Sequence, residues 1–548
     1  SNLLAAAAKG HRYHVQKVCR QGRININQQD RHGRSAVFLA AERGHAPTLA
    51  VLMGVRAKLD STNKDGWSPL HAATFHGQIA CMDTLINAAA EVNARDNFGC
   101  TPLALAASSP KLTLMDLISK RDRDKLKKVR KSVLNRRDME SSLQGTSIST
   151  LKNVNPTTVW QHFPNRIDLI VLDRLLQVKR TDVDAIDRKK RTPLIYAARY
   201  GRTICVSRLL YAKADLRHVD SDGRTALMQA CGHDHFETAE LLLRAGSSVN
   251  ATDQYFRTPL HMALLSANEP LAYMLLNAQA SVNAYDCEGR TPILLAMDAN
   301  NRRLFAELIQ RRSNLDVVDK RGWNVIIYAI EAGMLQDIAP RLQKVGDRVQ
   351  RILRARDPQG KNAMHHAVQL PNVRAANRAV EVIARIDPLC SIFGDCNGDT
   401  GLHMAAELGR LDILRILIDQ LPEPRADYEN NRKETPLHYA CHGGHLACVL
   451  ALIRITSTGE AACDAGAIDS DGRTFLMHAC VSGHLDLVNL LLGSREGIKE
   501  EVFLAPLDVN HQDSQGATAL SIAAREGHWQ LLPSLVLAGA NLTGIDRD

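Results

Sequence analysis

Apolar residues recur along this chain in short runs at helical spacing, and polar segments of nearly constant length separate the runs. After Thr192, the residues Leu194, Ala197 and Ala198 fall on one side of a short helix, and a second apolar run lies at residues 241–243. Thr is a good N-cap, and the Pro that follows it fits the first helical position because its φ is already helical. The pattern predicts a turn followed by two short helices, repeated along the chain.

The spacing of aspartates gives the length of this repeat. Aspartates recur every 33 residues at five successive positions, Asp187, Asp220, Asp253, Asp286 and Asp319. Two short helices cannot bury their apolar faces alone, so neighbouring repeats must stack and share one continuous core.

The repeats resemble the ankyrin repeat family, whose 33-residue repeat carries a Thr-Pro-Leu-His-x-Ala signature and a Gly-His pair between its helices. Residues 258–261 read Thr-Pro-Leu-His, and residues 68–71 read Ser-Pro-Leu-His. The resemblance covers nearly the whole chain and implies an all-α ankyrin-repeat solenoid of about fifteen repeats. It implies protein recognition without naming a partner, because ankyrin arrays bind very different proteins.

Departures from the regular spacing predict the domain organisation. We expect N-terminal repeats at 1–119 with the first one partial, a basic and Ser/Thr-rich, partly disordered insertion at 120–153, regular repeats at 154–356 and looser repeats with longer loops at 357–548. After Asp319 the spacing grows to between 35 and 44 residues, and we expect the extra residues to form longer helices or loops behind the second helix. An aspartate 33 residues after the last repeat start predicts that the chain is truncated at this end.

The interval between Asp96 and Asp187 is 91 residues long. We interpret it as one intact repeat, an insertion of 25 residues and one degenerate repeat. The degenerate repeat would begin near Val154, with a poor first helix around residues 159–163 and a clear second helix from Ile167.

Composition narrows the class of protein. The twelve cysteines are scattered without paired spacing, which indicates reduced thiols and a cytoplasmic protein, with a nuclear location also compatible. Aromatic residues make up only 4%, which suits a core of Leu, Ala, Ile and Val. No apolar run reaches the length of a membrane-spanning helix.

Motifs for catalysis or metal binding lack supporting context. The chain has no phosphate loop, dinucleotide-binding glycine motif, serine nucleophile motif or zinc-protease motif, so we expect no enzyme activity, cofactor or small-molecule ligand. The densest metal-like cluster is interpreted as repeat residues, since structural zinc usually shows paired ligands. That cluster comprises His438, Cys441, His442, His445 and Cys448. The Asp-x-Asp-Gly sequences at 220–223 and 469–472 lack the distal ligands of a calcium loop.

The insertion carries most of the net charge. Residues 120–138 hold ten Lys or Arg against three Asp, a net +7 of the chain's +9. This segment is interpreted as a solvated helix, as a nuclear-import or anion-binding segment, or as a switch in which nearby phosphates pair with the cations. Nucleic-acid binding is disfavoured because no aromatic residues interleave the basic run. The candidate modification sites are Ser141, Ser142, Thr146, Ser147 and Ser149 for phosphate, and Asn93, which resembles the asparagine hydroxylated in ankyrin repeats.

In the ankyrin family, contact positions usually lie at the turn tips and on the exposed side of the first helix. At these positions the chain holds basic and aromatic residues, which are common binding anchors. The predicted partner-binding residues are Arg188, Lys189, Arg191, Arg199, Tyr200, Arg224, Tyr255, Arg257, Arg290, Lys320, Arg321 and Trp323. They predict a protein partner with an acidic or phosphorylated, extended segment. A second candidate patch holds Arg31, His32, Arg34, Trp67 and Phe98.

The alternative interpretation is that the tip arginines only cap turns and maintain solubility. The predicted function is a non-catalytic interaction scaffold or adaptor. Three further hypotheses stay open: the cytosolic arm of an ion channel, the regulatory region of an ankyrin-bearing enzyme such as a palmitoyltransferase or kinase, and binding of nucleic acid or import factors by the insertion.

Overall fold

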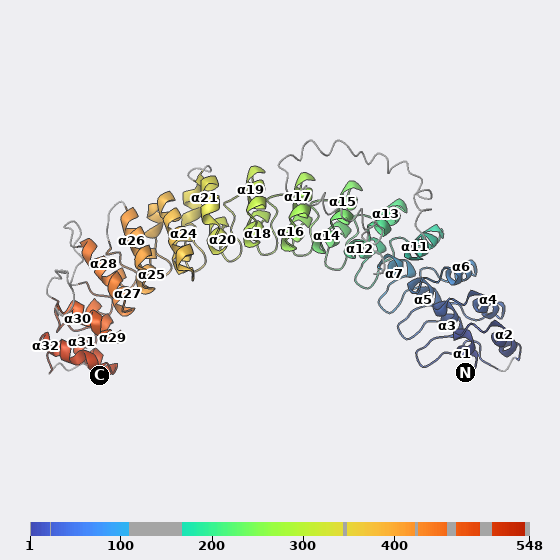
Figure 1. The fold of residues 1–548 in the computed structure, drawn as a ribbon, viewed down its shortest axis with the longest axis horizontal. Helices are drawn as coiled ribbons and strands as arrows, with labels where there is room; N and C mark the ends of the chain where they lie inside the picture. The colour runs from blue at the N-terminus through green and yellow to red at the C-terminus, as the bar shows by residue number, and fades with distance from the viewer. Residues whose placement is uncertain are drawn as a thin grey trace, which may run out of the picture. The chain divides into compact units, whose positions relative to one another are not determined.

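The chain folds into pairs of short antiparallel helices joined by turns (Figure 1). The computed structural model describes residues 2–21, 24–108, 167–343, 348–421, 426–456, 467–493 and 507–542. Within these residues the extended pairing is limited to two isolated bridges, Gln29 with Ser35 and Ile468 with Thr474. The residues divide into two compact units, Ser1–Cys287 (unit 1) and Glu288–Asp548 (unit 2).

Unit 1 stacks its helix pairs in two rows. Its first helices are α1 (Asn2–Ala8), α3 (Ala36–Arg43), α5 (Pro69–Phe75), α7 (Pro102–Ser108), α12 (Pro193–Arg199), α14 (Ala226–Gly232) and α16 (Pro259–Leu265). Its second helices are α2 (Arg12–Arg20), α4 (Ala46–Gly54), α6 (Ile79–Asn87), α11 (Ile167–Gln177), α13 (Thr203–Tyr211), α15 (Phe236–Arg244) and α17 (Glu269–Asn277). Each helix packs on its predecessor in the same row and on its partner in the pair.

Unit 2 has the same arrangement with longer connections. Its first helices are α18 (Pro292–Asp298), α20 (Val325–Glu331), α23 (Ala363–Gln369), α25 (Gly401–Glu407), α27 (Pro436–His442), α29 (Phe475–Ser482) and α31 (Ala519–Arg525). Its second helices are α19 (Arg302–Gln310), α21 (Leu335–Gln343), α24 (Val373–Ile386), α26 (Leu411–Gln420), α28 (Leu446–Thr456), α30 (Leu485–Leu491) and α32 (Leu532–Leu537). The extra residues form α22 (Arg348–Arg354) and η3 (Pro388–Ser391), and η4 (Trp529–Leu531) leads directly into α32. The looser spacing predicted longer helices or loops after the second helix, and α24 is such a longer helix.

The repeat aspartate closes each turn, here called a finger. Asp253 Oδ1 accepts the backbone N–H groups of Tyr255 and Arg257, both at 2.9 Å. Thr258 then caps the first helix: its side chain accepts from the His261 N–H, and the Thr258 N–H donates to His261 Nδ1 at 3.2 Å. The signature is therefore a capping box, in which the two residues satisfy each other's otherwise unpaired backbone donors.

The signature histidine also links neighbouring repeats. Nε2 of His71 bonds the carbonyl oxygen of Cys100 in the next repeat at 3.0 Å, and Nε2 of His365 bonds that of Asp399 at 2.7 Å. The rings are fully buried, so these bonds satisfy polar groups that would otherwise be costly to bury.

The fingers of each unit are joined to one another by backbone hydrogen bonds. The N–H of Ser221 donates to the carbonyl oxygen of Lys189 at 2.8 Å, and that of Gln254 donates to Asp222 at 3.0 Å. In unit 2 the same bond is made by the N–H groups of Lys320, Cys396, Asn431, Ser470 and Ser514. The finger at Asp357 is different, because Pro358 stands at this position and has no N–H to donate. The fingers of one unit therefore present their tips on a common side.

The structure assigns α7 and α11 to one repeat, although 58 residues separate them. The two helices pack on each other, and the N–H of Arg188 donates directly to the carbonyl oxygen of Phe98 at 2.9 Å. The stack therefore passes from the repeat at Asp96 to the one at Asp187 without an intervening repeat.

This corrects the expected degenerate repeat, because the helix from Ile167 completes the repeat begun at Asp96. The predicted repeat start near Val154 and its first helix lie outside the described residues. An interval of 91 residues equals one 33-residue repeat plus 58, so spacing alone did not distinguish the two solutions. Each unit holds seven helix pairs within the described residues, fourteen in all, which agrees with the expected array of about fifteen repeats. The expected boundaries at 119 and 153 also lie outside the described residues, and the boundary at 356 stays a prediction.

Candidate partner-binding surface

The predicted partner-binding residues of unit 1 occupy the fingers and the ends of the first helices. Arg188, Lys189 and Arg191 belong to one finger, and Arg199 and Tyr200 lie at the end of the α12 helix that follows it. In the next two repeats, the predicted residues are Arg224, Tyr255 and Arg257. Because backbone bonds join these fingers, the structure brings these residues together along one side of unit 1.

The arginine at the fifth position of several fingers is paired within its own repeat. Arg191 Nε donates to Asp187 Oδ2 at 2.9 Å, and Arg257 Nε donates to Asp253 Oδ2 at 2.9 Å. Burial acts to raise the pKa of Asp187, but hydrogen bonds from Arg191 and from the Tyr196 hydroxyl hold it below its ordinary value. These arginines hold the fingers in shape, as the alternative interpretation from the sequence supposed.

Other cations of the same fingers have no such partner. Arg188 and Lys189 are exposed, and none of the described residues forms an ion pair with either side chain. Lys190, which precedes Arg191, is also exposed and forms no ion pair with any described residue. It was not among the partner-binding residues predicted from the sequence. Its backbone is left-handed (φ 57°), at a position where other fingers have glycine. The uninterrupted basic run at 188–191 was the pattern that pointed to it.

Positive charge concentrates in one part of unit 1. We count the five finger residues of each repeat and the two residues at the end of its first helix. In the repeats at Asp187, Asp220 and Asp253 these positions hold seven Arg or Lys against four Asp. In the repeats at Asp30, Asn63 and Asp96 they hold four basic and four acidic residues. We call the first group of positions the basic zone.

The predicted residues in unit 2 have a different setting. Arg290, Lys320 and Arg321 share the equivalent positions of their two repeats with five acidic residues. Arg321 bonds Asp319 Oδ2 at 3.1 Å, and its guanidinium lies 4.3 Å from the centre of the Trp323 ring. The excess of positive charge that marks the basic zone is therefore absent from the equivalent positions of these two repeats. A binding role for Arg290, Lys320, Arg321 and Trp323 stays a prediction.

The N-terminal patch is built around aromatic rings. Trp67 packs on Phe75 with ring centroids 5.1 Å apart, and Phe98 is exposed at a finger tip. Arg34 pairs with Asp30 at 2.9 Å, so its charge is compensated within its finger.

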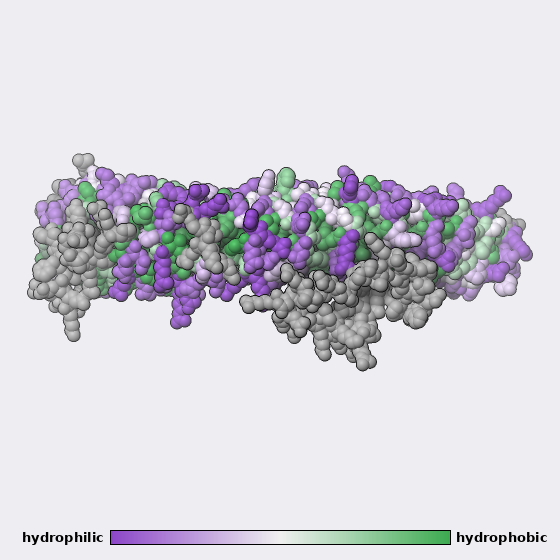
Figure 2. Space-filling model, turned by 90° about the horizontal axis from the view of Figure 1, so that it is seen from above, coloured by the Kyte–Doolittle hydropathy of each residue, from purple (hydrophilic) through white to green (hydrophobic). Residues whose placement is uncertain are grey.

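The opposite face, formed by the second helices, carries hydrophilic residues with smaller hydrophobic areas between them (Figure 2).

The histidines around α27 make hydrogen bonds within their own repeat and to the repeats on either side. His438 Nδ1 accepts the Thr435 N–H at 3.1 Å, and burial lowers the pKa of His438 to about 4. His445 Nε2 bonds the carbonyl oxygen of Glu407 at 2.8 Å, and His442 Nδ1 lies 3.3 Å from Ser482 Oγ. Cys441 and Cys448 are buried, and burial raises the pKa of Cys448 to about 11.

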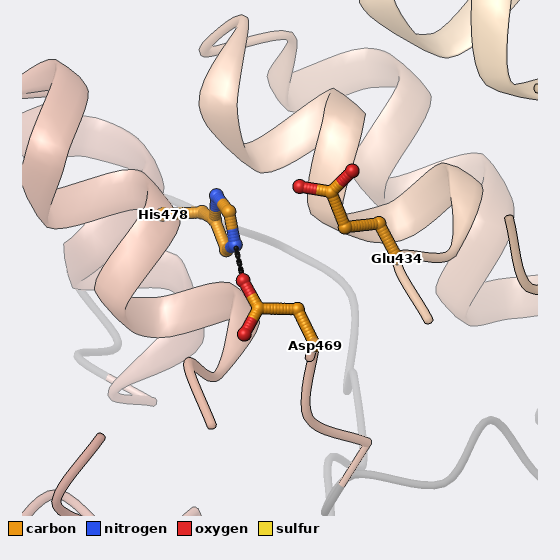
Figure 3. A group of neighbouring side chains, drawn as sticks. All are labelled: Glu434, Asp469 and His478. Atoms are coloured by element: carbon orange, nitrogen blue, oxygen red, sulfur yellow. Dashed lines mark hydrogen bonds and ion pairs between the residues drawn. The ribbon is translucent and has the colours of Figure 1, made fainter. Parts of the chain in front are cut away.

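A group that sequence reasoning missed comprises Glu434, Asp469 and His478, whose possible metal-ligating atoms lie within 4.8 Å of one another (Figure 3). His478 Nε2 bonds Asp469 Oδ2 at 2.9 Å. In Figure 3 the Glu434 carboxylate lies apart from this pair, and it accepts from Asn430 Nδ2 at 3.0 Å. The three residues come from two fingers and one helix, so no local motif indicated them.

The bond between His478 and Asp469 is a feature of the repeat. The tenth residue of other repeats makes the same bond to its aspartate, from Tyr196 at 2.8 Å and from Gln229 at 2.7 Å. Tyr, Gln and His each carry a side-chain hydrogen-bond donor, and from the tenth position of the repeat this donor reaches the aspartate. The fold thus explains two members of the group without a metal ion.

Asn93 joins its repeat to the next one. Its Nδ2 donates to the carbonyl oxygen of Arg180 at 2.8 Å, and its Oδ1 accepts the N–H of Asp182 at 2.9 Å. Its hydroxylation stays a prediction.

The basic run and the five candidate phosphorylation sites of the insertion lie outside the described residues. Within the described residues, no helix is long and apolar enough to cross a membrane.

Stacked two-helix repeats with aligned fingers define a helical-repeat recognition protein. A family model described as ankyrin repeats (3 copies) matches residues 3–96, 51–128, 166–253, 373–460, 402–502 and 458–546, which is well over half of the chain. The chain belongs to the ankyrin repeat family. Ankyrin repeats are generally non-catalytic protein-interaction modules, and this chain is therefore a protein-interaction domain.

The chain is similar to parts of several known proteins. It is 32% identical over 150 residues to the B-cell lymphoma 3 protein homolog of Mus musculus, covering 27% of this chain and 30% of that protein. It is 33% identical over 141 residues to XBAT31 of Arabidopsis thaliana, named as a candidate E3 ubiquitin-protein ligase, covering 25% of this chain and 29% of that protein. The chain thus spans less than a third of either relative. The crystal structure of the Bcl-3 ankyrin repeat domain is similar at 19% identity, covering 50% of this chain and 98% of that domain, with a TM-score of 0.37.

Proposed function

We propose that this chain is a non-catalytic scaffold or adaptor that binds an acidic or phosphorylated, extended segment of a partner protein along the basic zone of unit 1. The observation that carries the proposal is the pair of exposed, internally unpaired cations Arg188 and Lys189. Tyr200 and Tyr255 lie in the same zone and are each 44% exposed, so large rings stand beside the charges.

The surface is held before the partner arrives. Backbone bonds between fingers and the pairs of Arg191 with Asp187 and Arg257 with Asp253 fix the zone's shape. An extended segment that binds there loses its own freedom, but the repeat array loses little. The hypotheses of a channel arm or an enzyme's regulatory region are compatible with the same surface, and any sequence of the parent protein beyond Asp548 would distinguish them.

The location that fits this function is the cytoplasm or the nucleus. None of the eleven cysteines among the described residues forms a disulfide, which suits a reducing compartment.

The test is a double charge reversal, Arg188→Glu with Lys189→Glu, in the full chain. The probe is a fluorescent library of extended peptides rich in Asp and Glu, and the readout is anisotropy at two salt concentrations. We expect about a tenfold loss of affinity and a weaker salt dependence, because two cations near the ligand become anions. The matched control is Arg31→Glu with Lys64→Glu in the neutral fingers of the same unit. Unchanged binding, or an equal loss in the control, would refute the proposal.

A further inference from the structure

Three basic side chains come from two neighbouring repeats whose first helices, α12 and α14, pack side by side. Arg199 is the last residue of α12, His233 follows the last residue of α14, and Arg224 lies at the base of the finger that leads into α14. His233 is exposed, and partial desolvation together with the charges of Arg199, His235 and Arg224 holds its pKa below its ordinary value. The packing of α12 on α14 places the repeats that carry these groups side by side.

The guanidinium of Arg224 lacks an acceptor for its buried Nε among the described residues. Asp222 and Asp253 approach it at 3.8 and 3.7 Å, within ion-pair range but beyond hydrogen-bond range. Asp253 is already engaged, because its Oδ2 accepts from Arg257 at 2.9 and 2.7 Å. A buried donor without a partner is costly, and the two ion pairs at 3.8 and 3.7 Å hold the guanidinium without a hydrogen bond. A small shift of this side chain toward a ligand oxygen therefore gains hydrogen bonds that the fold does not supply.

The approach to these groups is open. Gly232, at the end of α14, is exposed, and a Cβ added to it meets only the Met262 sulfur at 3.9 Å. The other two repeats of the basic zone carry Arg199 and Leu265 at this position. The missing side chain leaves space beside His233 for a ligand group.

We propose that Arg199, Arg224 and His233 form a phosphate-binding subsite for a phosphoserine or phosphothreonine in the partner's extended segment. The inference rests on the proposed function and names the modification that the basic zone recognises. A phosphate offers three acceptor oxygens and nearly two negative charges, which matches donors arriving from an α12 end, an α14 end and a finger. A carboxylate offers two oxygens in one plane and a single charge.

The subsite also couples binding to a proton. A bound phosphate reverses the local potential at His233 and raises its pKa, so the complex takes up a proton. Other charged groups around the ring are Arg199 from α12, Arg224 and Asp222 from its finger, and His235 from the start of α15. Affinity therefore rises as the pH falls from 8 to about 6.5, before the phosphate itself begins to protonate near its second pKa of about 6.

The experiment compares three peptide libraries that differ only at a fixed central residue: phosphoserine, serine or glutamate. Binding to the full chain is measured by anisotropy. We expect the phosphoserine library to bind at least about tenfold more tightly than the serine library. Gly232→Glu should abolish the difference by placing a carboxylate at the opening, without removing any existing contact. The matched control is Gly54→Glu, because Gly54 also ends a helix and a Cβ there meets nothing within 4 Å.

A His233→Gln variant supplies a second readout, since it should remove the pH dependence while retaining most of the affinity. Equal binding of the glutamate and phosphoserine libraries, or an unchanged preference in Gly232→Glu, would overturn the subsite and leave the proposed acidic-segment function standing. A further outcome is that the double variant at Arg188 and Lys189 loses all binding while Gly232→Glu binds as the wild type does. That result would also overturn the subsite and leave the proposed acidic-segment function standing.

Discussion

The buried signature histidines predict that acid destabilises the fold, and His438 gives the clearest case. Its side chain is 1% exposed, and burial lowers its pKa from 6.5 to about 4. The unfolded chain therefore binds a proton between these pH values while the folded chain does not. A folded-state pKa depressed in this way gives stability that is full above pH 6.5 and is lost as the pH falls toward 4.

The size of the effect follows from the two pKa values. At pH 5 an unfolded histidine is almost fully protonated and the folded His438 is not, which costs about 2 kcal/mol of unfolding free energy. Burial lowers the pKa values of His71, His365 and His403 as well, so each acts in the same direction. Asp187 and Asp469 have lowered pKa values, and their contribution is lost only at still lower pH.

The perturbation is His438→Gln, because glutamine is the usual third residue of a capping box and does not titrate. It keeps an acceptor for the Thr435 N–H. Urea unfolding followed by far-ultraviolet circular dichroism at pH 7.5 and 5.0 should show similar stability at pH 7.5. The loss between the two pH values should be about 2 kcal/mol smaller than in the wild type. His14→Gln, at an exposed histidine, is the control. An unaltered pH dependence in His438→Gln would refute the reasoning.

Two further predictions test the repeat geometry. Replacing His478 by leucine should cost about 1–3 kcal/mol in urea unfolding, because it leaves the buried Asp469 carboxylate without its donor. Replacing it by glutamine, which bonds the aspartate in the repeat at Asp220, should cost less than about 1 kcal/mol, and an equal loss in both would contradict the donor role. Replacing residues 109–166 by a short Gly/Ser linker should leave the urea midpoint of unit 1 unchanged, because α7 already packs on α11. Loss of the unit 1 transition would show that the segment supplies a missing part of the stack.

The sequence predicted the repeat well because each feature of the repeat is local. The aspartate of a finger, the Thr-Pro start and the signature histidine act within a few residues of one another. Their spacing in the sequence is therefore enough to predict the finger and the start of the first helix. The pairing of α7 with α11 is not local, and the apolar pattern from Ile167 shows that a helix exists without showing which first helix it joins. The group of Glu434, Asp469 and His478 was missed for the same reason.

Candidate binding residues were harder to sort, because residue type does not reveal whether a charge is already used. Arg191 and Lys189 belong to the same finger and both are basic. The structure distinguishes them, since the Arg191 side chain is bonded to Asp187 and the Lys189 side chain has no ion-pair partner among the described residues. Part of this distinction was accessible in the sequence, where Arg191 follows its aspartate by four residues in the way Arg257 follows Asp253.

That separation bears on how the array gains specificity while keeping its fold. An arginine already bonded to a buried aspartate gives little to a ligand, because the ligand must share or break an existing pair. A cation without such a pair loses only hydration and side-chain freedom when a ligand arrives. The side chains of Arg188, Lys189 and Arg199 have no ion pair among the described residues to give up, and Arg224 has only ion pairs at 3.7 and 3.8 Å, whereas Arg191 and Arg257 are held by their fingers. The repeats that hold unpaired donors, rather than those richest in arginine, are where a partner should be sought.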